Sequence, residues 1–143
     1  MTHEMDPAER DAFLDAMPAR PAILAVTRKD GRPIGVPIWY VRDGEDLIFN
    51  TNVATLKGKS VMRDGNISLT VQDPVAPFSY VIAEGEATWE DGADDLLHWA
   101  TVIGGRYMGD AVAEQYGQRN AVPGELVVRL RPTRWQSAKD VAS

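Results

Sequence analysis

Short runs rich in apolar, β-forming residues recur along this chain between polar turn residues, which is the pattern of β-strands. Such runs cover residues 22–28, 34–42, 46–51, 66–72, 78–89 and 125–131. Asp-Gly pairs at 30–31 and 43–44 separate the first three runs, and this dipeptide favours tight turns between antiparallel strands. We therefore predict six or so antiparallel strands that begin with two hairpins.

Helical patterns are fewer. A capping box formed by Asp6 and Glu9, with Pro7 at the first helical position, predicts a helix over residues 7–17. Further helices are predicted over 55–63, from after Asp91 through the stripe that ends at Tyr107, and over 110–116 with an end at Gly117. The third has an apolar stripe at i, i+4, i+7 and i+11: Leu96, Ala100, Ile103 and Tyr107. The pattern predicts a mostly β fold, a β-barrel with three or four short peripheral helices.

The length of 143 residues fits one domain over residues 1–143, and we expect the chain after Trp135 to fray. The formal net charge of −6 argues against binding of nucleic acid through a general basic field. We expect no membrane span, because no apolar run approaches ~20 residues. The N-terminus lacks a signal-peptide pattern, so a cytoplasmic location is expected.

Residues for direct catalysis or metal binding are scarce. The chain has no cysteine and only two histidines, His3 and His98, which do not form a metal-binding motif. No nucleophile motif occurs either. We therefore predict neither catalytic side chains nor a metal site, and any redox chemistry has to come from a cofactor.

A run of hydroxyl and amide side chains ends the third predicted strand and leads into a cationic helix. Asn50, Thr51, Asn52 and Thr55 come first, and Lys57 and Lys59 follow. The N-terminus of a helix binds anions, and adjacent ammonium groups strengthen this, so the run predicts a phosphate site. A solvated helix face is the alternative. Residues two apart point to different sides of a helix, so Lys57 is the stronger candidate.

The second predicted strand contains Gly35 and Pro37, which are unusual inside a sheet. Proline has no N–H to donate, so this strand is predicted to be an edge. Exposed main-chain groups flanked by Val36, Ile38 and Trp39 suit a flat heteroaromatic ring with polar edges. The alternative is a distorted edge strand with Trp39 in the core.

Four short motifs follow one another with characteristic spacing. They are Gly-x-Pro-x-x-x-Pro-x-Trp at 31–39, Phe-Asn-Thr with Lys-x-Lys and Arg-Asp-Gly-Asn-Ile-Ser-Leu-Thr-Val within 49–71, Arg-Tyr-Met-Gly at 106–109, and Leu-Arg-Pro-Thr-Arg-Trp at 130–135. In this order they resemble the split β-barrel, FMN-binding proteins related to pyridoxamine 5′-phosphate oxidase. Within that superfamily the chain is most similar to the branch that binds the deazaflavin coenzyme F420.

The resemblance implies an F420-dependent oxidoreductase that transfers a hydride to a small conjugated or quinone-like acceptor, or to a tetrapyrrole such as biliverdin. An FMN-dependent oxidoreductase of the same fold is the alternative. A noncatalytic flavin or deazaflavin carrier, or a haem-binding protein with His98 as axial ligand, is a third reading.

The resemblance also implies a homodimer with cofactor sites at the subunit interface, and an opened barrel edge should leave apolar surface in need of cover. It assigns the cofactor phosphate to the polar and cationic run, and the ring to the second strand. Gln72 would reach the cofactor, with Arg106 and Tyr107 added from the other subunit. The implied cofactor-binding residues are Val36, Pro37, Ile38, Trp39, Thr51, Asn52, Thr55, Lys57, Lys59, Gln72, Arg106 and Tyr107.

Overall fold

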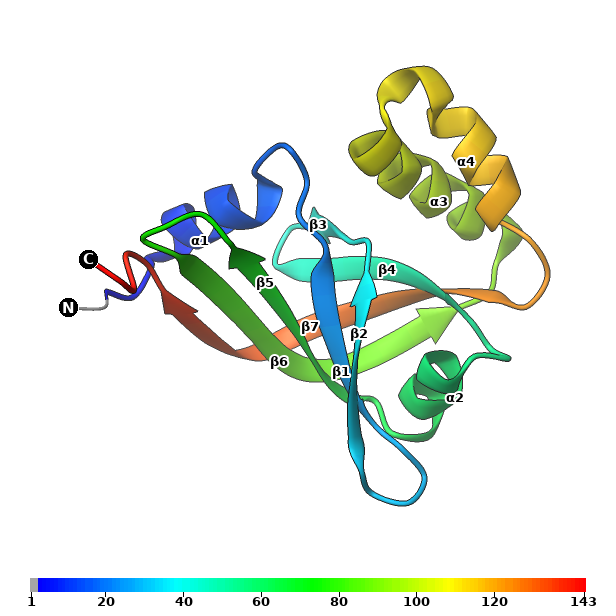
Figure 1. Ribbon diagram of the computed structural model, residues 1–143. Helices are drawn as coiled ribbons and strands as arrows, with labels where there is room; N and C mark the ends of the chain where they lie inside the picture. The colour runs from blue at the N-terminus through cyan, green and yellow to red at the C-terminus, as the bar shows by residue number, and fades with distance from the viewer. Residues whose placement is uncertain (1–2) are drawn as a thin grey trace.

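The two edges of the sheet are strands that follow one another directly in the chain. The computed structural model describes residues 3–143, and its strands lie in the order β2-β1-β5-β6-β7-β4-β3 in one antiparallel sheet (Figure 1). Only Trp39 and Tyr40 connect the edge strands β2 and β3, so the sheet curls until its edges approach each other. The strands are β1 (Ala22–Thr27), β2 (Pro33–Ile38), β3 (Val41–Asp43), β4 (Asp46–Asn52), β5 (Asn66–Asp73), β6 (Ser79–Glu90) and β7 (Glu125–Ala138).

The predicted mostly β architecture is confirmed, including both hairpins. Strand β1 pairs with β2 and β3 pairs with β4, each across the Asp-Gly turn that the sequence indicated. Pro37 lies on the edge strand β2, as its missing N–H requires. The single run predicted over 34–42 is wrong in one respect. It divides into two strands, because the Tyr40 N–H donates to the Tyr107 hydroxyl (3.3 Å) instead of joining a ladder.

Strand β7 is longer than the sequence pattern indicated. It continues past residue 131 to Ala138 and remains paired with β6, so the expectation of fraying directly after Trp135 is corrected. The register shifts beside Gly85, where an added Cβ would lie 2.2 Å from the Arg131 carbonyl oxygen. Because of this close approach, β6 and β7 stay paired on both sides of Pro132, which has no N–H to donate to the ladder.

The helices are α1 (Pro7–Asp15), α2 (Leu56–Arg63), α3 (Ala93–Met108) and α4 (Ala113–Asn120), with a 3₁₀ turn η1 (Asp110–Val112) before α4. Helix α1 ends two residues earlier than predicted, at Asp15. The predicted end of the last helix at Gly117 is wrong, since α4 continues to Asn120. Gly117 is instead a close helix–helix contact: a Cβ there would lie 2.0 Å from the Thr101 Oγ1.

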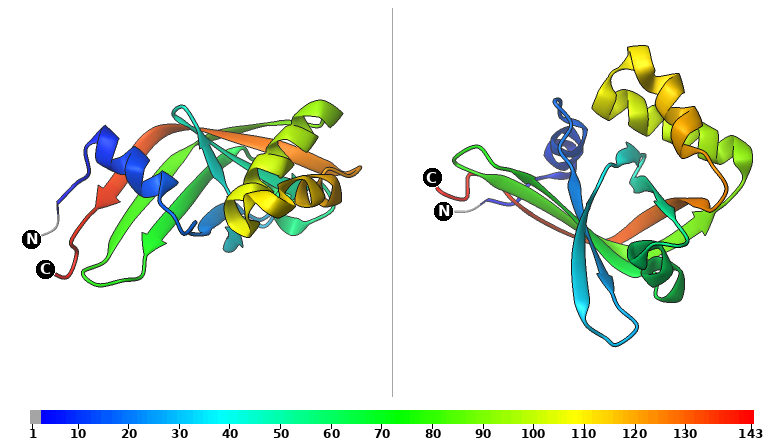
Figure 2. Two further views of the ribbon diagram at one scale, coloured as in Figure 1. Left: turned by 90° about the horizontal axis from the view of Figure 1, so that it is seen from above. Right: turned by 45° about the vertical axis from the view of Figure 1, so that its right-hand side comes forward.

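The apolar core has two parts. The larger fills the curled sheet, with Tyr40, Phe49 and Leu130 among its fully buried side chains. The smaller lies between β4, β7 and the apolar stripe of α3, where Leu96 and Ile103 are buried as predicted. Helix α4 packs on α3 rather than on the sheet, so the two form a helical hairpin beside the barrel (Figure 2).

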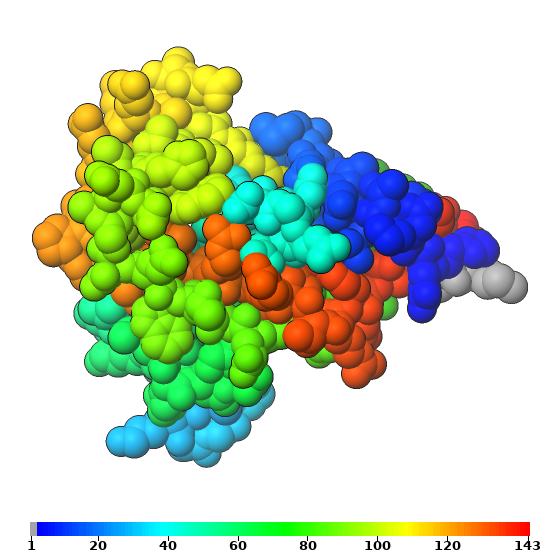
Figure 3. Space-filling view, turned by 180° about the vertical axis from the view of Figure 1, so that it is seen from behind, coloured from blue at the N-terminus to red at the C-terminus, as the bar shows by residue number. Residues whose placement is uncertain are grey.

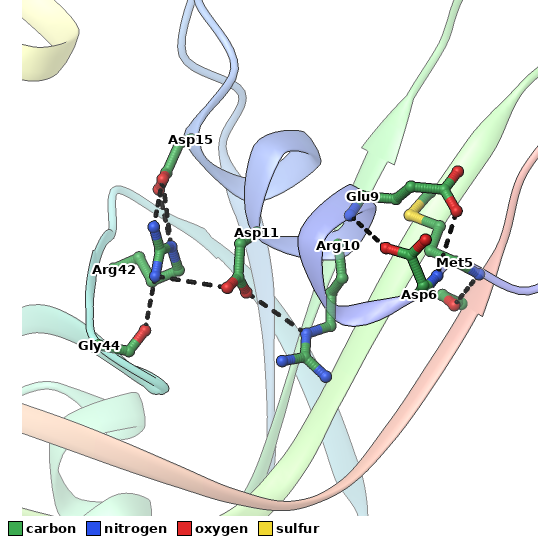
Figure 4. A network of polar contacts seen from close by, with 9 residues as sticks. Met5, Asp6, Glu9, Arg10, Asp11, Asp15, Arg42 and Gly44 are labelled. Carbon is green, nitrogen blue, oxygen red and sulfur yellow. Dashed lines mark hydrogen bonds and ion pairs between the residues drawn. The ribbon is translucent and has the colours of Figure 1, made fainter.

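Helix α1 is held against the β3–β4 hairpin by charge-assisted hydrogen bonds. Arg42 donates to both carboxylate oxygens of Asp15, the shortest contact being 2.6 Å, and to the Gly44 carbonyl (Figure 4). Figure 3 shows β3 between α1 and α3. No helix within residues 3–143 is long and apolar enough to cross a membrane.

Asp46 is a buried carboxylate that joins β4 to β7. It accepts hydrogen bonds from Arg131 (3.1 and 3.2 Å) and from Arg129 (3.0 Å). The hydrogen bond from Arg131 lowers the pKa of Asp46 below its usual value; burial opposes this shift, and the bond from Arg129 adds to it. The ion pairs therefore fix the turn end of the β3–β4 hairpin against β7.

Asp46→Asn is expected to lower the free energy of unfolding by about 1–3 kcal/mol near pH 7, since a charged acceptor is lost. The folded pKa lies below the unfolded value, so the carboxylate contributes fully above about pH 4 and loses its contribution as the pH falls further. Urea unfolding of both proteins at neutral and acidic pH measures this. A stability difference that stays constant down to acidic pH would contradict the assignment.

Candidate functional site

A polar pocket of about 320 Å³ lies where the end of β2, the start of α2 and the α3–α4 hairpin meet β4 and β7. Two of its walls are parts of the chain that the sequence singled out, the proline-containing strand and the cationic helix. The remaining walls come from distant segments. The lining residues are Pro37, Ile38, Trp39, Asn50, Lys57, Ala100, Ile103, Asn120 and Glu125.

A tight turn after β4 positions the first residues of α2. The Thr55 hydroxyl donates to the Asn52 carbonyl (2.7 Å) and accepts the Gly58 N–H (3.1 Å), which caps the helix. The Asn52 side chain accepts the Ala54 N–H (2.9 Å). An added Cβ on Gly58 would lie 2.0 Å from the Asn52 carbonyl oxygen, so only glycine fits between turn and helix. The turn thus fixes where Lys57 projects.

Lys57 is the cation of the polar pocket. Its side chain is half-buried, lines the pocket, and makes no hydrogen bond or ion pair with any residue between 3 and 143. Lys59 is exposed and is not among the lining residues. This agrees with the two-residue spacing, which directs the two ammonium groups to different sides of α2.

The polar residues before α2 have structural partners in the turn itself. Thr51 is buried, with its hydroxyl 3.4 Å from that of Thr55, while Asn52 and Thr55 make the bonds described above. None of the three lines the polar pocket. Their direct contact with a phosphate stays a prediction; what the structure shows is that they build the turn that presents Lys57.

The end of β2 forms an exposed wall of the pocket. Pro37 and Trp39 are exposed there, whereas Ile38 is buried in the core beneath. Val36 is half-buried and pairs with Leu24, so it does not line the pocket. The alternative that placed Trp39 in the core is wrong, because its side chain is 37% exposed.

Arg106 and Tyr107 hold this wall in place from α3. The Trp39 and Tyr107 rings stack with 5.0 Å between centroids and 3° between planes. The Tyr107 hydroxyl donates to the Arg20 carbonyl (2.7 Å), and burial raises the pKa of Tyr107 to about 12. Arg106 donates to the Tyr40 carbonyl (2.7 Å) and also to that of Leu14 (2.6 Å). Both residues therefore act in this chain as supports of the Trp39 corner.

Gln72 is exposed and lies apart from the polar pocket. It lines a second, mainly apolar pocket of about 690 Å³ with Ile23, Thr70 and the segment 17–21. Ile23 pairs directly with Pro37 across the β1–β2 ladder, so the two pockets approach each other over these two residues. Within one chain the structure does not bring Gln72 and Lys57 together.

Two polar residues of the pocket, Asn120 and Glu125, were not predicted, and Asn50 was placed in the polar run without being assigned to the cofactor. The Asn50 Oδ1 and Glu125 Oε2 atoms are buried and have no hydrogen-bond partner among the described residues. No sequence signal marked Glu125, since it reaches the pocket only because β7 pairs with β4, with Glu125 opposite Asn52.

The pocket has opposite charges on different walls. Lys57 supplies the positive charge and Glu125 the negative charge, and they form no ion pair with each other. No group of three metal-binding side chains occurs within residues 3–143. His98 is exposed, packs edge-on against Trp99 and does not line this pocket. The arrangement suits a ligand with an anionic end and a flat, largely apolar part that can cover Pro37 and Trp39.

Comparison with known proteins places most of the chain in one family. Residues 7–139 match the family described as Pyridoxamine 5′-phosphate oxidase. No curated protein matches the sequence. Several solved structures are similar, and at under 25% sequence identity these likenesses show the fold.

One similar structure is the conserved hypothetical protein Rv2991 from Mycobacterium tuberculosis, with a TM-score of 0.82 and 23% identity, covering 95% of this chain and 86% of that one. An F420 reductase has a TM-score of 0.66 at 21% identity, with 82% and 89% covered. An FAD and heme binding protein from Mycobacterium smegmatis has a TM-score of 0.72 at 17% identity, with 94% and 70% covered. The split β-barrel expected from the sequence is thus confirmed.

Proposed function

The chain belongs to the pyridoxamine 5′-phosphate oxidase family, and from this premise we propose that it is a coenzyme F420-dependent oxidoreductase. Its reaction would transfer a hydride from reduced F420 to a small conjugated or quinone-like acceptor, with tetrapyrroles such as biliverdin as a further candidate. The observation that carries the proposal is the partnerless Lys57 ammonium in a pocket whose next wall is the exposed Pro37–Trp39 corner.

The residues present fit a phosphate-bearing planar cofactor. A half-buried ammonium without a protein partner gains a charge-assisted hydrogen bond when a phosphate binds. The Pro37 ring and the Trp39 indole offer apolar surface for a flat heterocycle, and the stacking of Trp39 on Tyr107 limits its movement. When bound, the deazaflavin supplies the hydride chemistry.

The contribution of the chain is binding and orientation. Lys57 holds the anionic end, while Pro37 and Trp39 set the plane of the ring and shield one side of it from water. The Tyr107 hydroxyl keeps its proton at neutral pH, since its pKa is about 12, and that proton is donated to the Arg20 carbonyl. Tyr107 therefore serves as a support, and a proton needed by the reduced acceptor comes from solvent.

The order of the motifs, which resembles that of the deazaflavin branch, supports F420 over the alternatives. An F420 reductase has the same fold, but so does the FAD and heme binding protein, so the fold by itself does not distinguish the cofactors. FMN remains the alternative cofactor because it shares the phosphate and the planar ring. A noncatalytic binding role is a further alternative, because one structural neighbour is an FAD and heme binding protein. If this chain bound haem, His98 would be the axial ligand, and His98 lies outside the polar pocket.

Equilibrium titration of the purified protein with F420 and with FMN tests the cofactor. Quenching of tryptophan fluorescence reports binding, since Trp39 lies beside the proposed ring, and we expect F420 to bind with the lower Kd. Tighter binding of FMN would select the alternative, and binding of neither would contradict the proposal. Oxidation of reduced F420 by a panel of quinone, conjugated and tetrapyrrole acceptors then separates an enzyme from a carrier.

The proposal includes a homodimer that shares its cofactor sites. The outward-facing residues of three adjacent strands are small or uncharged and form a continuous face: Gly35 and Pro37 of β2, Ile23 and Ala25 of β1, and Ser68, Thr70 and Gln72 of β5. A face of this kind is suited to pack against its copy. Such packing would cover the apolar pocket and bring Gln72 of each chain toward the cofactor of the other.

Thr70→Arg is expected to convert the dimer to monomers, because the two-fold contact would bring like charges together on a desolvated face. Sedimentation at micromolar concentration measures this, and F420 affinity should fall in parallel. Gln118→Arg, on the exposed side of α4, adds the same charge away from this face and should remain dimeric. A wild-type protein that sediments as a monomer would contradict the shared site.

A further inference from the structure

The two buried oxygens of the polar pocket need hydrogen-bond donors that the chain does not supply. Asn50 Oδ1 and Glu125 Oε2 are shielded from solvent and have no partner among the described residues. Buried polar atoms in folded proteins are paired in the great majority of cases, and an unpaired one is costly. Both residues line the same pocket. This arrangement indicates that a ligand supplies the hydrogen-bond donors that the two oxygens lack.

The chemistry of these atoms restricts the ligand group that can lie there. A carboxylate oxygen only accepts hydrogen bonds, so the group facing Glu125 has to carry O–H or N–H donors. A phosphate oxyanion against Glu125 would be repelled. The phosphate therefore lies toward Lys57, and a neutral donor-bearing segment lies toward Glu125.

Hydroxyl groups fit this end of the pocket better than the edge of a ring does. A ring placed here would leave the apolar Pro37–Trp39 wall without a partner. The Asn120 side chain lines the same region and makes no hydrogen bond with another described residue, so it is free to donate to a ligand oxygen. A hydroxyl both donates and accepts, and can therefore satisfy Glu125 and Asn120 together.

We infer that Glu125, with Asn50 and Asn120, forms a polyol subsite that binds the hydroxyl groups of a phosphorylated sugar-alcohol chain. The inference rests on the proposed function, since the ribityl phosphate is the segment that the deazaflavin and FMN have in common. It assigns Glu125 as a specificity-determining residue: it selects ligands whose phosphate and ring are joined by a hydroxylated linker.

Paired ligands and paired variants test this inference. The probes are 8-hydroxy-5-deazaflavin ribityl phosphate and a synthetic analogue in which an unsubstituted pentyl chain replaces the ribityl chain, with the same ring and phosphate. Glu125→Leu removes the acceptor, and Glu125→Gln retains one oxygen in the same shape. Glu86→Leu, on the exposed part of β6, is the matched control. Tryptophan quenching gives the Kd of each pair.

Glu125→Leu should weaken the ribityl ligand by about tenfold or more and the pentyl ligand by less than about twofold. Glu125→Gln should lie between Glu125→Leu and the wild type, and Glu86→Leu should match the wild type. Equal losses for both ligands, or no loss for the ribityl ligand in either Glu125 variant, would overturn the polyol subsite while leaving the cofactor proposal intact. A wild-type protein that binds neither probe would overturn both.

Discussion

Lys57→Ala is expected to weaken binding of F420 by about 10- to 150-fold, because one charge-assisted contact to the phosphate is lost, about 1.5–3 kcal/mol. The same substitution should leave the thermal unfolding midpoint nearly unchanged. Lys57 has no partner among the described residues, so its removal leaves no protein group unsatisfied. Fluorescence titration and a melting curve on the same sample separate the two effects.

Lys59→Ala is the matched control for this result. Lys59 belongs to the same helix and carries the same charge, yet it is exposed and lies outside the polar pocket. A general electrostatic attraction would make the two substitutions equivalent, whereas a specific phosphate contact makes Lys57→Ala much the larger. Equal effects, or an unchanged Kd in Lys57→Ala, would remove Lys57 from the site.

Gly58→Ala is expected to destabilise the protein and to impair cofactor binding together. Helix propensity alone predicts the opposite, since alanine is favoured over glycine inside a helix by about 1 kcal/mol. The structure predicts a loss of stability instead of a gain, because the new Cβ would lie 2.0 Å from the backbone oxygen of Asn52. Relief of such a clash shifts the turn or α2, at a cost of about 1–3 kcal/mol or more, and moves Lys57.

Gly92→Ala is the control for this substitution. Gly92 lies at the start of α3, where an added Cβ meets nothing closer than 3.9 Å. Melting curves and F420 titrations of both variants give the comparison, and Gly92→Ala should be close to the wild type in both. A Gly58→Ala protein that melts higher than the wild type and binds F420 normally would contradict the role of this close approach.

The strands and hairpins were predictable because their signals are local. Runs of β-forming residues marked the strands, and the Asp-Gly turns joined β1 to β2 and β3 to β4. Pro37 indicated an edge strand for a backbone reason that does not depend on the rest of the fold. The preference for Lys57 over Lys59 followed from helix geometry in the same way.

The features that were missed depend on contacts between distant segments. The break between β2 and β3 requires the Tyr107 hydroxyl at the Tyr40 N–H, and no pattern within 34–42 contains it. The length of β7 depends on the close approach at Gly85, more than forty residues earlier in the chain. The far wall of the polar pocket likewise exists only once β7 has paired with β4, which places Glu125.

Arg106 and Tyr107 show the limit of motif-based assignment. The resemblance placed both at the cofactor as contributions from a second subunit. In this chain their side chains form hydrogen bonds with backbone groups of residues 14, 20 and 40, and the Tyr107 ring stacks on Trp39. The motif therefore correctly placed both residues near Trp39. The role of each side chain there depends on contacts that the sequence did not reveal. Their contact with a cofactor stays a prediction.

A crystal structure of the protein grown with saturating F420 would show whether Lys57 holds the cofactor phosphate. We predict the cofactor phosphate within hydrogen-bond distance of the Lys57 ammonium, with the deazaflavin ring against Pro37 and Trp39. An ordered cofactor bound elsewhere, with Lys57 making no contact to it, would contradict the assignment of Lys57 to the phosphate.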